Sequence, residues 1–109
     1  MADAARKHRW KARLWIMQMG RCWICEQDIA NIREATIDHV IPRPCKGRNQ
    51  FNHIVGNILL AHRKCNSTRG NSPPTPFEKA FAEAIYYKAR EIPLEDIKPL
   101  YNQSRYGTF

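Results

Sequence analysis

The stretch from Asp38 to Asn66 holds the side chains most suited to chemistry. Asp38 and His39 stand side by side, and Asn66 directly follows Cys65. Carboxylate and amide oxygens are ligands that Mg²⁺ or Mn²⁺ prefers, and a histidine can accept a proton near neutral pH. These groups suit the metal-assisted hydrolysis of a phosphodiester, which needs a deprotonated water on one side of phosphorus and a stabilised leaving oxygen on the other.

Four further side chains have the spacing of a structural zinc site. Two residues separate Cys22 from Cys25, and two separate His62 from Cys65. Thiolate and imidazole ligands in two such pairs predict one closed tetrahedral zinc site, rather than a ladder of disulfides. The alternative is that these thiols are simply small buried hydrophobic groups. Cys45 remains outside the set, and we interpret it as a free thiol.

Together these residues resemble the core of the HNH endonucleases. The resemblance covers Arg21 to Gly70 and rests on Asp38-His39-Val40-Ile41-Pro42, on Asn57 with the apolar residues after it, and on Cys65. With Asn66 as the last motif residue, the pattern is similar to that of the recombination endonuclease VII group. It departs from most of the family at His62, where a cysteine is usual, and at Asn66, where many members have histidine.

The resemblance implies a ββα-metal fold and cleavage that leaves 5′-phosphate and 3′-hydroxyl ends. Asp38 and Asn66 are then expected to hold the catalytic Mg²⁺ or Mn²⁺, with His39 as general base. Asn57 would hold the strand that carries the base. Simpler interpretations remain for each: a structural histidine at position 39, a turn residue at Asn57 and a helix cap at Asn66.

Two other histidines give weaker indications of function. His53 could contact phosphate or assist as a second acid, although we favour the interpretation of an ordinary exposed loop histidine. His8 is interpreted as part of a basic helix and nothing more.

The net charge of +8 is concentrated around this stretch. Residues 1–21 contain six Lys or Arg with Asp3 as the only acid, and residues 41–71 contain six with no acid. Basic blocks that flank a candidate active site predict DNA as the partner. We expect phosphate contacts with little reading of sequence from the following residues: Arg9, Arg13, Arg43, Lys46, Arg48, Arg63, Lys64 and Arg69.

The elements predicted around the site make an α+β fold. Helical periodicity predicts a helix over residues 3–19 that ends at Gly20 and whose basic first half projects or frays. Residues 35–40 are predicted to form a strand that Pro42 and Pro44 end, and residues 58–61 the return strand. A short helix should begin near Arg63 and end before Gly70.

A helical extension is predicted after the boundary at residues 71–74. Thr75, Pro76 and Glu78 form the pattern of a capping box with proline at the first helical position. The helix is expected to continue to about residue 90. Its apolar face would consist of Phe77, Ala80, Phe81, Ala84, Ile85 and the stem of Lys88. Pro93 and Pro99 are expected to break the rest into a short helix and a loosely ordered tail.

The sequence therefore predicts one domain over residues 1–109: a basic helix (1–20), a zinc-bound ββα-metal motif (21–70) and a helical extension (71–109). We expect a metal-dependent DNA endonuclease of the kind that phages carry. No apolar run is long enough to span a bilayer, so a cytoplasmic protein is expected. It would be a monomer or homodimer, or would dock on a DNA-processing complex through the C-terminal helix. The alternative function is a zinc-stabilised nucleic-acid-binding module without catalysis.

Overall fold

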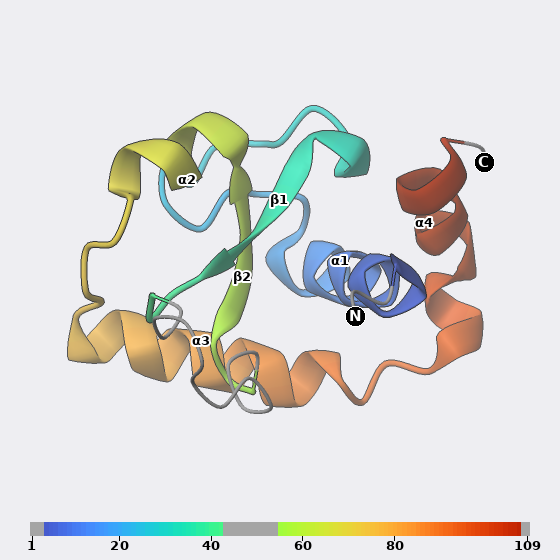
Figure 1. Ribbon diagram of the computed structural model, residues 1–109. Coiled ribbons are helices and arrows are strands. Elements are labelled where there is room, and N and C mark those ends of the chain that lie inside the picture. The colour runs from blue at the N-terminus through green and yellow to red at the C-terminus, as the bar shows by residue number, and fades with distance from the viewer. Residues whose placement is uncertain (1–3, 43–54, 108–109) are drawn as a thin grey trace.

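A two-stranded antiparallel sheet with a short helix directly after it lies at the centre of the fold (Figure 1). This computed structural model describes residues 4–42 and 55–107. In chain order the elements are α1 (Ala4–Gln18), η1 (Ile32–Glu34), β1 (Ala35–His39), β2 (Ile58–His62), α2 (Arg63–Arg69), α3 (Pro76–Ala89) and α4 (Leu94–Tyr106). The predicted α+β class is confirmed, with both strands and the short helix in their predicted places. None of the helices in the described residues has the length and apolar character needed to cross a bilayer.

The strand register decides which side chains of the motif share a face. Ala35 pairs with His62, and the pairing continues to His39 opposite Ile58. Successive side chains of a strand point to opposite faces, so Asp38 and His39 serve different sides of the sheet. The turn before β2 closes through a hydrogen bond from the Val40 N–H to the Asn57 carbonyl oxygen (2.9 Å).

The main core forms where α1 and α3 pack against the sheet. Leu14, Leu60 and Ala89 are fully buried there, and the Trp10 ring stacks on Tyr86 at 4.6 Å between centroids. The capping box of α3 is present, with Thr75 accepting from the Glu78 N–H and Glu78 accepting from the Thr75 N–H, as predicted.

Gln18 joins α1 to β2 in a way that the sequence did not suggest. Its amide oxygen accepts from the Leu60 N–H (2.7 Å), and its Nε2 donates to the Leu60 carbonyl (3.0 Å) and to the Arg21 carbonyl (2.8 Å). The side chain is 9% exposed. It therefore satisfies backbone groups of β2 that face the core rather than another strand.

The predicted apolar face of α3 is wrong for most of its residues. The helix buries Ala82, Tyr86 and Ala89, whereas Phe77 is 77% exposed and Phe81 is 39% exposed. Positions 82, 86 and 89 share a stripe at helical spacing. The small Ala82 and Ala89 allow close approach of the helix, and Tyr86 between them stacks on Trp10. The exposed phenylalanine rings stack on each other at 6.4 Å. The docking or dimer surface on this helix stays a prediction.

Two expectations for the chain ends are also wrong. Residues 94–106 form one helix with Pro99 inside it, not a short helix and a loose tail. The basic half of α1 does not project, because the His8 Nδ1 lies 2.7 Å from the Ser104 Oγ and the Arg13 Nε donates to the Ile92 carbonyl (3.1 Å). Packing between α1 and α4 stabilises both ends, which outweighs the one helical hydrogen bond that Pro99 cannot make.

We predict that Gln18→Met destabilises the protein by about 1–3 kcal/mol, because the buried Leu60 N–H loses its partner while the side-chain volume stays similar. The Leu60 carbonyl keeps the hydrogen bond from the Trp23 N–H (3.0 Å). Thermal and urea unfolding followed by circular dichroism measure the change. Gln27→Met, at an exposed position, is the control and should change stability by less than about 0.5 kcal/mol. Equal stability of the Gln18 variant and the control would contradict this role.

Candidate metal and catalytic site

Cys22, Cys25, His62 and Cys65 form a single cluster at the junction of β2 and α2. Their donor atoms all lie within 4.8 Å of one another. The His62 Nδ1 lies 3.3 Å from the Cys25 Sγ and 3.7 Å from the Cys65 Sγ. Zinc bonds of about 2.0–2.3 Å place tetrahedral donors roughly 3.5–3.8 Å apart, so this soft donor set fits a structural zinc ion.

Hydrogen bonds with backbone groups orient the Cys22 and His62 side chains in the way that metal binding requires. The Ile24 and His62 N–H groups both donate to the Cys22 Sγ at 3.4 Å. The His62 Nε2 lies 3.0 Å from the Asp28 carbonyl oxygen. Since a carbonyl only accepts, Nε2 carries the hydrogen, and Nδ1 presents its lone pair to the metal.

The thiols of the cluster differ in acidity. Burial raises the pKa of the Cys22 thiol, but hydrogen bonds from the backbone of Cys25, His62 and Ile24 outweigh it and bring that pKa to about 7. Burial and the neighbouring thiols of Cys25 and Cys22 raise the pKa of Cys65 to about 11. Because zinc binds thiolates, metal binding would have to displace the Cys65 proton, and zinc affinity should weaken in acid.

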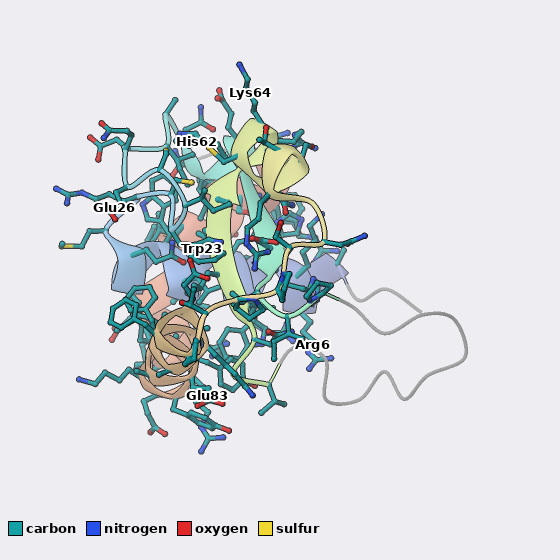
Figure 2. The ribbon with its side chains drawn as sticks, turned by 90° about the vertical axis from the view of Figure 1, so that its left-hand side faces the viewer. Arg6, Trp23, Glu26, His62, Lys64 and Glu83 are labelled. Atoms are coloured by element: carbon teal, nitrogen blue, oxygen red, sulfur yellow. The ribbon has the colours of Figure 1, made fainter. Side chains whose placement is uncertain are left out.

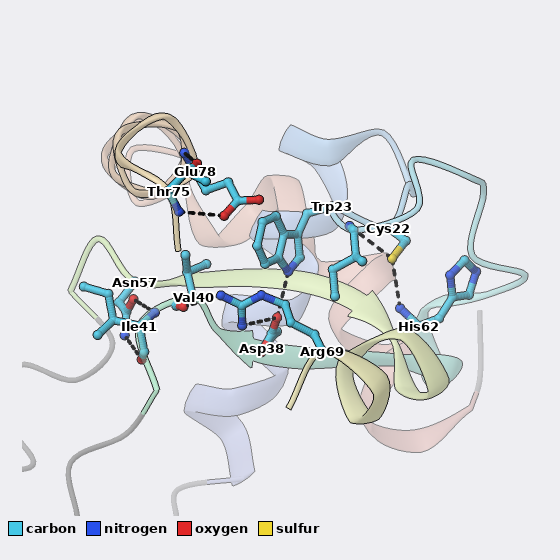
Figure 3. Close-up of polar contacts among 11 residues, drawn as sticks. Cys22, Trp23, Asp38, Val40, Ile41, Asn57, His62, Arg69, Thr75 and Glu78 are labelled. Atoms are coloured by element: carbon cyan, nitrogen blue, oxygen red, sulfur yellow. Dashed lines mark hydrogen bonds and ion pairs between the residues drawn. The ribbon is translucent and has the colours of Figure 1, made fainter. Parts of the chain in front are cut away.

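The Asp38 carboxylate is enclosed by two cationic or polar partners (Figure 3). Its Oδ2 accepts from the Trp23 Nε1 at 2.8 Å and lies 3.6 Å from the Arg69 Nη1. Asp38 is 4% exposed. Burial raises the pKa of Asp38, whereas the Trp23 hydrogen bond and the Arg69 charge oppose that rise. Trp23 was missed in the sequence, although a tryptophan between two zinc ligands has both an apolar ring and an N–H donor to place.

Arg69 is central to this arrangement. Its guanidinium also donates to the Val40 carbonyl through Nη2 (2.6 Å) and lies over the Trp23 ring, 4.9 Å from the centroid. The Arg69 side chain is only 10% exposed and holds α2 against β1. Its predicted role as a phosphate contact stays a prediction.

Asn57 contacts the chain just after β1, and Asn66 lies on α2, the helix that packs against β1. The Asn57 Oδ1 accepts from the Ile41 N–H (2.7 Å), and its Nδ2 donates to the Ile41 carbonyl (3.0 Å). Asn66 is half-buried on α2, one turn before Arg69, so its side chain shares the helix face that meets β1. These positions are compatible with the predicted roles, which stay predictions.

His39 ends β1, opposite Ile58. Its side chain is half-buried, with Nε2 enclosed by the surrounding atoms. The strand pairing and the Asn57 clamp fix the backbone on both sides of it. Its predicted role as base stays a prediction.

The remaining predicted phosphate contacts fall into three groups. Arg63 and Lys64 are exposed on α2, and Lys64 points outward at the end of the molecule opposite Glu83 (Figure 2). Arg9 is half-buried beside α4, and Arg13 is held by Ile92. The other predicted residues lie outside the described ones: Arg43, Lys46, Arg48, His53 and Cys45.

Comparison with known proteins agrees with this geometry. Residues 21–72 match the family model described as HNH endonuclease, which supports the HNH family for the segment from the first zinc knuckle to the end of α2. Neither the comparison with curated proteins nor that with solved structures found a match. The match supports an HNH-type domain in this segment, which also carries the candidate structural zinc site. HNH domains are associated with nucleases and nucleic-acid-binding modules.

We predict that zinc removal unfolds the domain, since a small chain relies on the metal to hold the knuckle against β2 and α2. Cys65→Ser should lose zinc, measured by elemental analysis, and should lose the cooperative melt measured by circular dichroism. Cys45→Ser is the matched control and should keep one zinc per chain and the same melt. An unchanged cooperative melt after zinc is stripped would contradict the prediction.

We predict that Arg69→Met lowers the free energy of unfolding by about 3–5 kcal/mol, because the buried Asp38 carboxylate loses its counter-charge. In the double variant Asp38→Asn/Arg69→Met the loss should be smaller than the sum of the single losses. Urea unfolding of the four proteins gives the coupling energy. Additive losses would show that the two side chains do not depend on each other.

Proposed function

We propose that this protein is a metal-dependent DNA endonuclease with His39 as general base. A divalent ion, Mg²⁺ or Mn²⁺, is held by Asp38 and Asn66, and the products carry 5′-phosphate and 3′-hydroxyl ends. The asparagine in the last motif position resembles the recombination endonuclease VII pattern. The match of residues 21–72 to the HNH endonuclease family supports the class of reaction.

The observation that carries the proposal is the contact of α2 with the carboxylate of β1. Arg69 lies 3.6 Å from Asp38, and Asn66 lies one turn earlier on the same helix. The helix that carries Asn66 is thereby packed against the strand that carries Asp38, which supports a shared metal site for the two side chains. Both Trp23 and Arg69 contact Oδ2, so Oδ1 takes part in neither contact and can serve as the metal ligand.

When bound, a hard divalent ion would stabilise the negative charge that develops on the leaving 3′-oxygen. Asp38 and Asn66 supply only two protein ligands, and Arg69 already neutralises part of the Asp38 charge. We therefore expect weak metal binding by the protein alone, strengthened when substrate phosphate adds oxygen ligands and negative charge.

His39 is suited to take a proton from water. Since its Nε2 is enclosed, Nδ1 is the nitrogen that would accept the proton. Asp38 and His39 point to opposite sides of β1 at its end, which allows one to act at the leaving oxygen and the other at the attacking water. Asn57 holds the chain immediately after His39 through both backbone groups of Ile41.

The rival function is a zinc-stabilised nucleic-acid-binding module without catalysis. One observation favours it: the ion pair with Arg69 satisfies the Asp38 carboxylate without any metal. The two functions differ in whether divalent ions and His39 are needed for any measurable product.

A supercoiled-plasmid nicking assay tests the proposal. Zinc-loaded protein should nick the plasmid when Mg²⁺ or Mn²⁺ is added and should not nick without it. His39→Ala should lower the nicking rate by about 10²–10⁴-fold, because a positioned base contributes that much, while DNA affinity stays nearly the same. Lys88→Gln, on the exposed part of α3, is the control and should nick at the wild-type rate.

Loss of nicking in Asp38→Asn and Asn66→Ala would support the assigned ligands, provided that each variant keeps its zinc and stays folded at the assay temperature. Asp38→Asn is expected to melt lower than the wild type, because it also breaks the ion pair with Arg69. If the wild type binds DNA but never nicks it with either metal, the binding module is the better description.

A further inference from the structure

A group of basic side chains gathers where α1, η1 and the start of α2 meet, away from the Asp38–Arg69 pair. We name it the cationic cluster: Lys7 and Lys11 on α1, Arg33 on η1 and Arg63 on α2. Lys7 and Lys11 are one helical turn apart and share a face. The pairing of Ala35 with His62 brings Arg33 and Arg63 to the same end of the sheet.

Lys11 is the unusual member, because a lysine is rarely buried without a partner. It is 4% exposed, and among the described residues no hydrogen bond or ion pair satisfies it. Burial, followed by the positive charges of Lys7, Arg63 and Arg33, lowers the pKa of Lys11 to about 8. The acid next to the cluster in sequence, Glu34, accepts a hydrogen bond from the Asn31 Nδ2 (3.1 Å).

The neighbouring residues extend the positive field rather than neutralise it. Burial and the charges of Lys11, Lys7, Arg105 and Arg33 lower the pKa of His8. The Arg33 guanidinium is packed against the end of α4, since a Cβ at Gly107 would fall 2.6 Å from its Nη1. Arg33 is thus held beside Lys11 by contacts that do not neutralise it.

We propose that the cationic cluster is a binding site for a phosphate group of the DNA backbone, with Lys11 at its base and Arg33, Arg63 and Lys7 around it. Such an anion would supply the counter-charge that the Lys11 ammonium lacks among the described residues. The inference rests on the proposed function only in taking DNA as the source of the phosphate.

The site is separate from the phosphate that would be cleaved. At about 3.3 Å per residue, the strand places Arg33 roughly 16–20 Å from His39, which corresponds to about five base-pair rises of 3.4 Å. The cluster would therefore position the duplex at a distance from the reacting bond, without reading its sequence.

Two measurements on the zinc-loaded protein test this site. The first is the melting temperature with inorganic phosphate against chloride at equal ionic strength. Phosphate should raise the melting temperature of the wild type and not of Lys11→Met. Lys11→Met should itself melt higher than the wild type in chloride, because an uncompensated buried charge is gone.

The second is the affinity for a short DNA duplex as a function of salt, without added Mg²⁺ or Mn²⁺. Arg33→Gln and Lys11→Met should each lower the slope of log K against log salt by about 0.9 and weaken binding about fivefold at 0.15 M salt, as expected for one lost phosphate contact. Lys88→Gln is the matched control and should leave the slope unchanged.

The outcomes separate this site from the nuclease activity. Unchanged slopes in Arg33→Gln and Lys11→Met overturn the site, even if the protein nicks DNA. A phosphate-dependent melting shift with unchanged DNA slopes also overturns it, because the cluster would then hold free phosphate only. Reduced slopes in a protein that never nicks DNA support the site and refute the nuclease.

Discussion

The packing of α2 against β1 controls the rest of the site. The helix starts directly after β2, so two zinc ligands, His62 and Cys65, lie at its beginning and Arg69 lies at its end. A zinc ion held by the cluster would fix where the helix starts, and the Arg69 contacts with Asp38 and Val40 fix its direction. Breaking a buried ion pair costs about 3–5 kcal/mol, a large part of the roughly 5–15 kcal/mol that stabilises a domain. The position of Asn66, between these two attachments, follows from both.

The enclosure of Asp38 involves a compromise between stability and chemistry. A buried carboxylate needs partners, and Trp23 and Arg69 provide them at Oδ2. The same partners reduce the negative charge available to a divalent cation. In the proposed endonuclease, such a site would suit an ion that arrives with its substrate, because the phosphate would restore the charge and ligands that the protein withholds. Asn57 contributes differently, since it fixes the backbone after His39 instead of adding charge.

The cationic cluster shows the opposite compromise. Lys11 is buried among like charges, an arrangement that lowers stability unless an anion binds. The apolar residues beside it, Ala12, Ile32 and Ile97, hold α1, η1 and α4 together and keep the cluster in place. Stability gained from apolar packing thus maintains a charge arrangement that is unfavourable without a ligand. Apolar contacts hold the cationic cluster in place, and the four soft ligands would hold the HNH-matched segment in place through a zinc ion.

The sequence by itself determined the features that depend on near neighbours: both strands, the α3 capping box, the end of α1 near Gly20 and the four soft ligands in two evenly spaced pairs. These signals are local because they reflect backbone preferences, caps and metal-ligand spacing. Only the tertiary structure decided which face of α3 is buried, that α4 continues through Pro99, that His8 meets Ser104, and that Arg69 pairs with Asp38 instead of facing solvent. Those outcomes depend on side chains brought together from up to 96 residues apart, as for His8 and Ser104, and the pattern around either residue alone does not contain its partner.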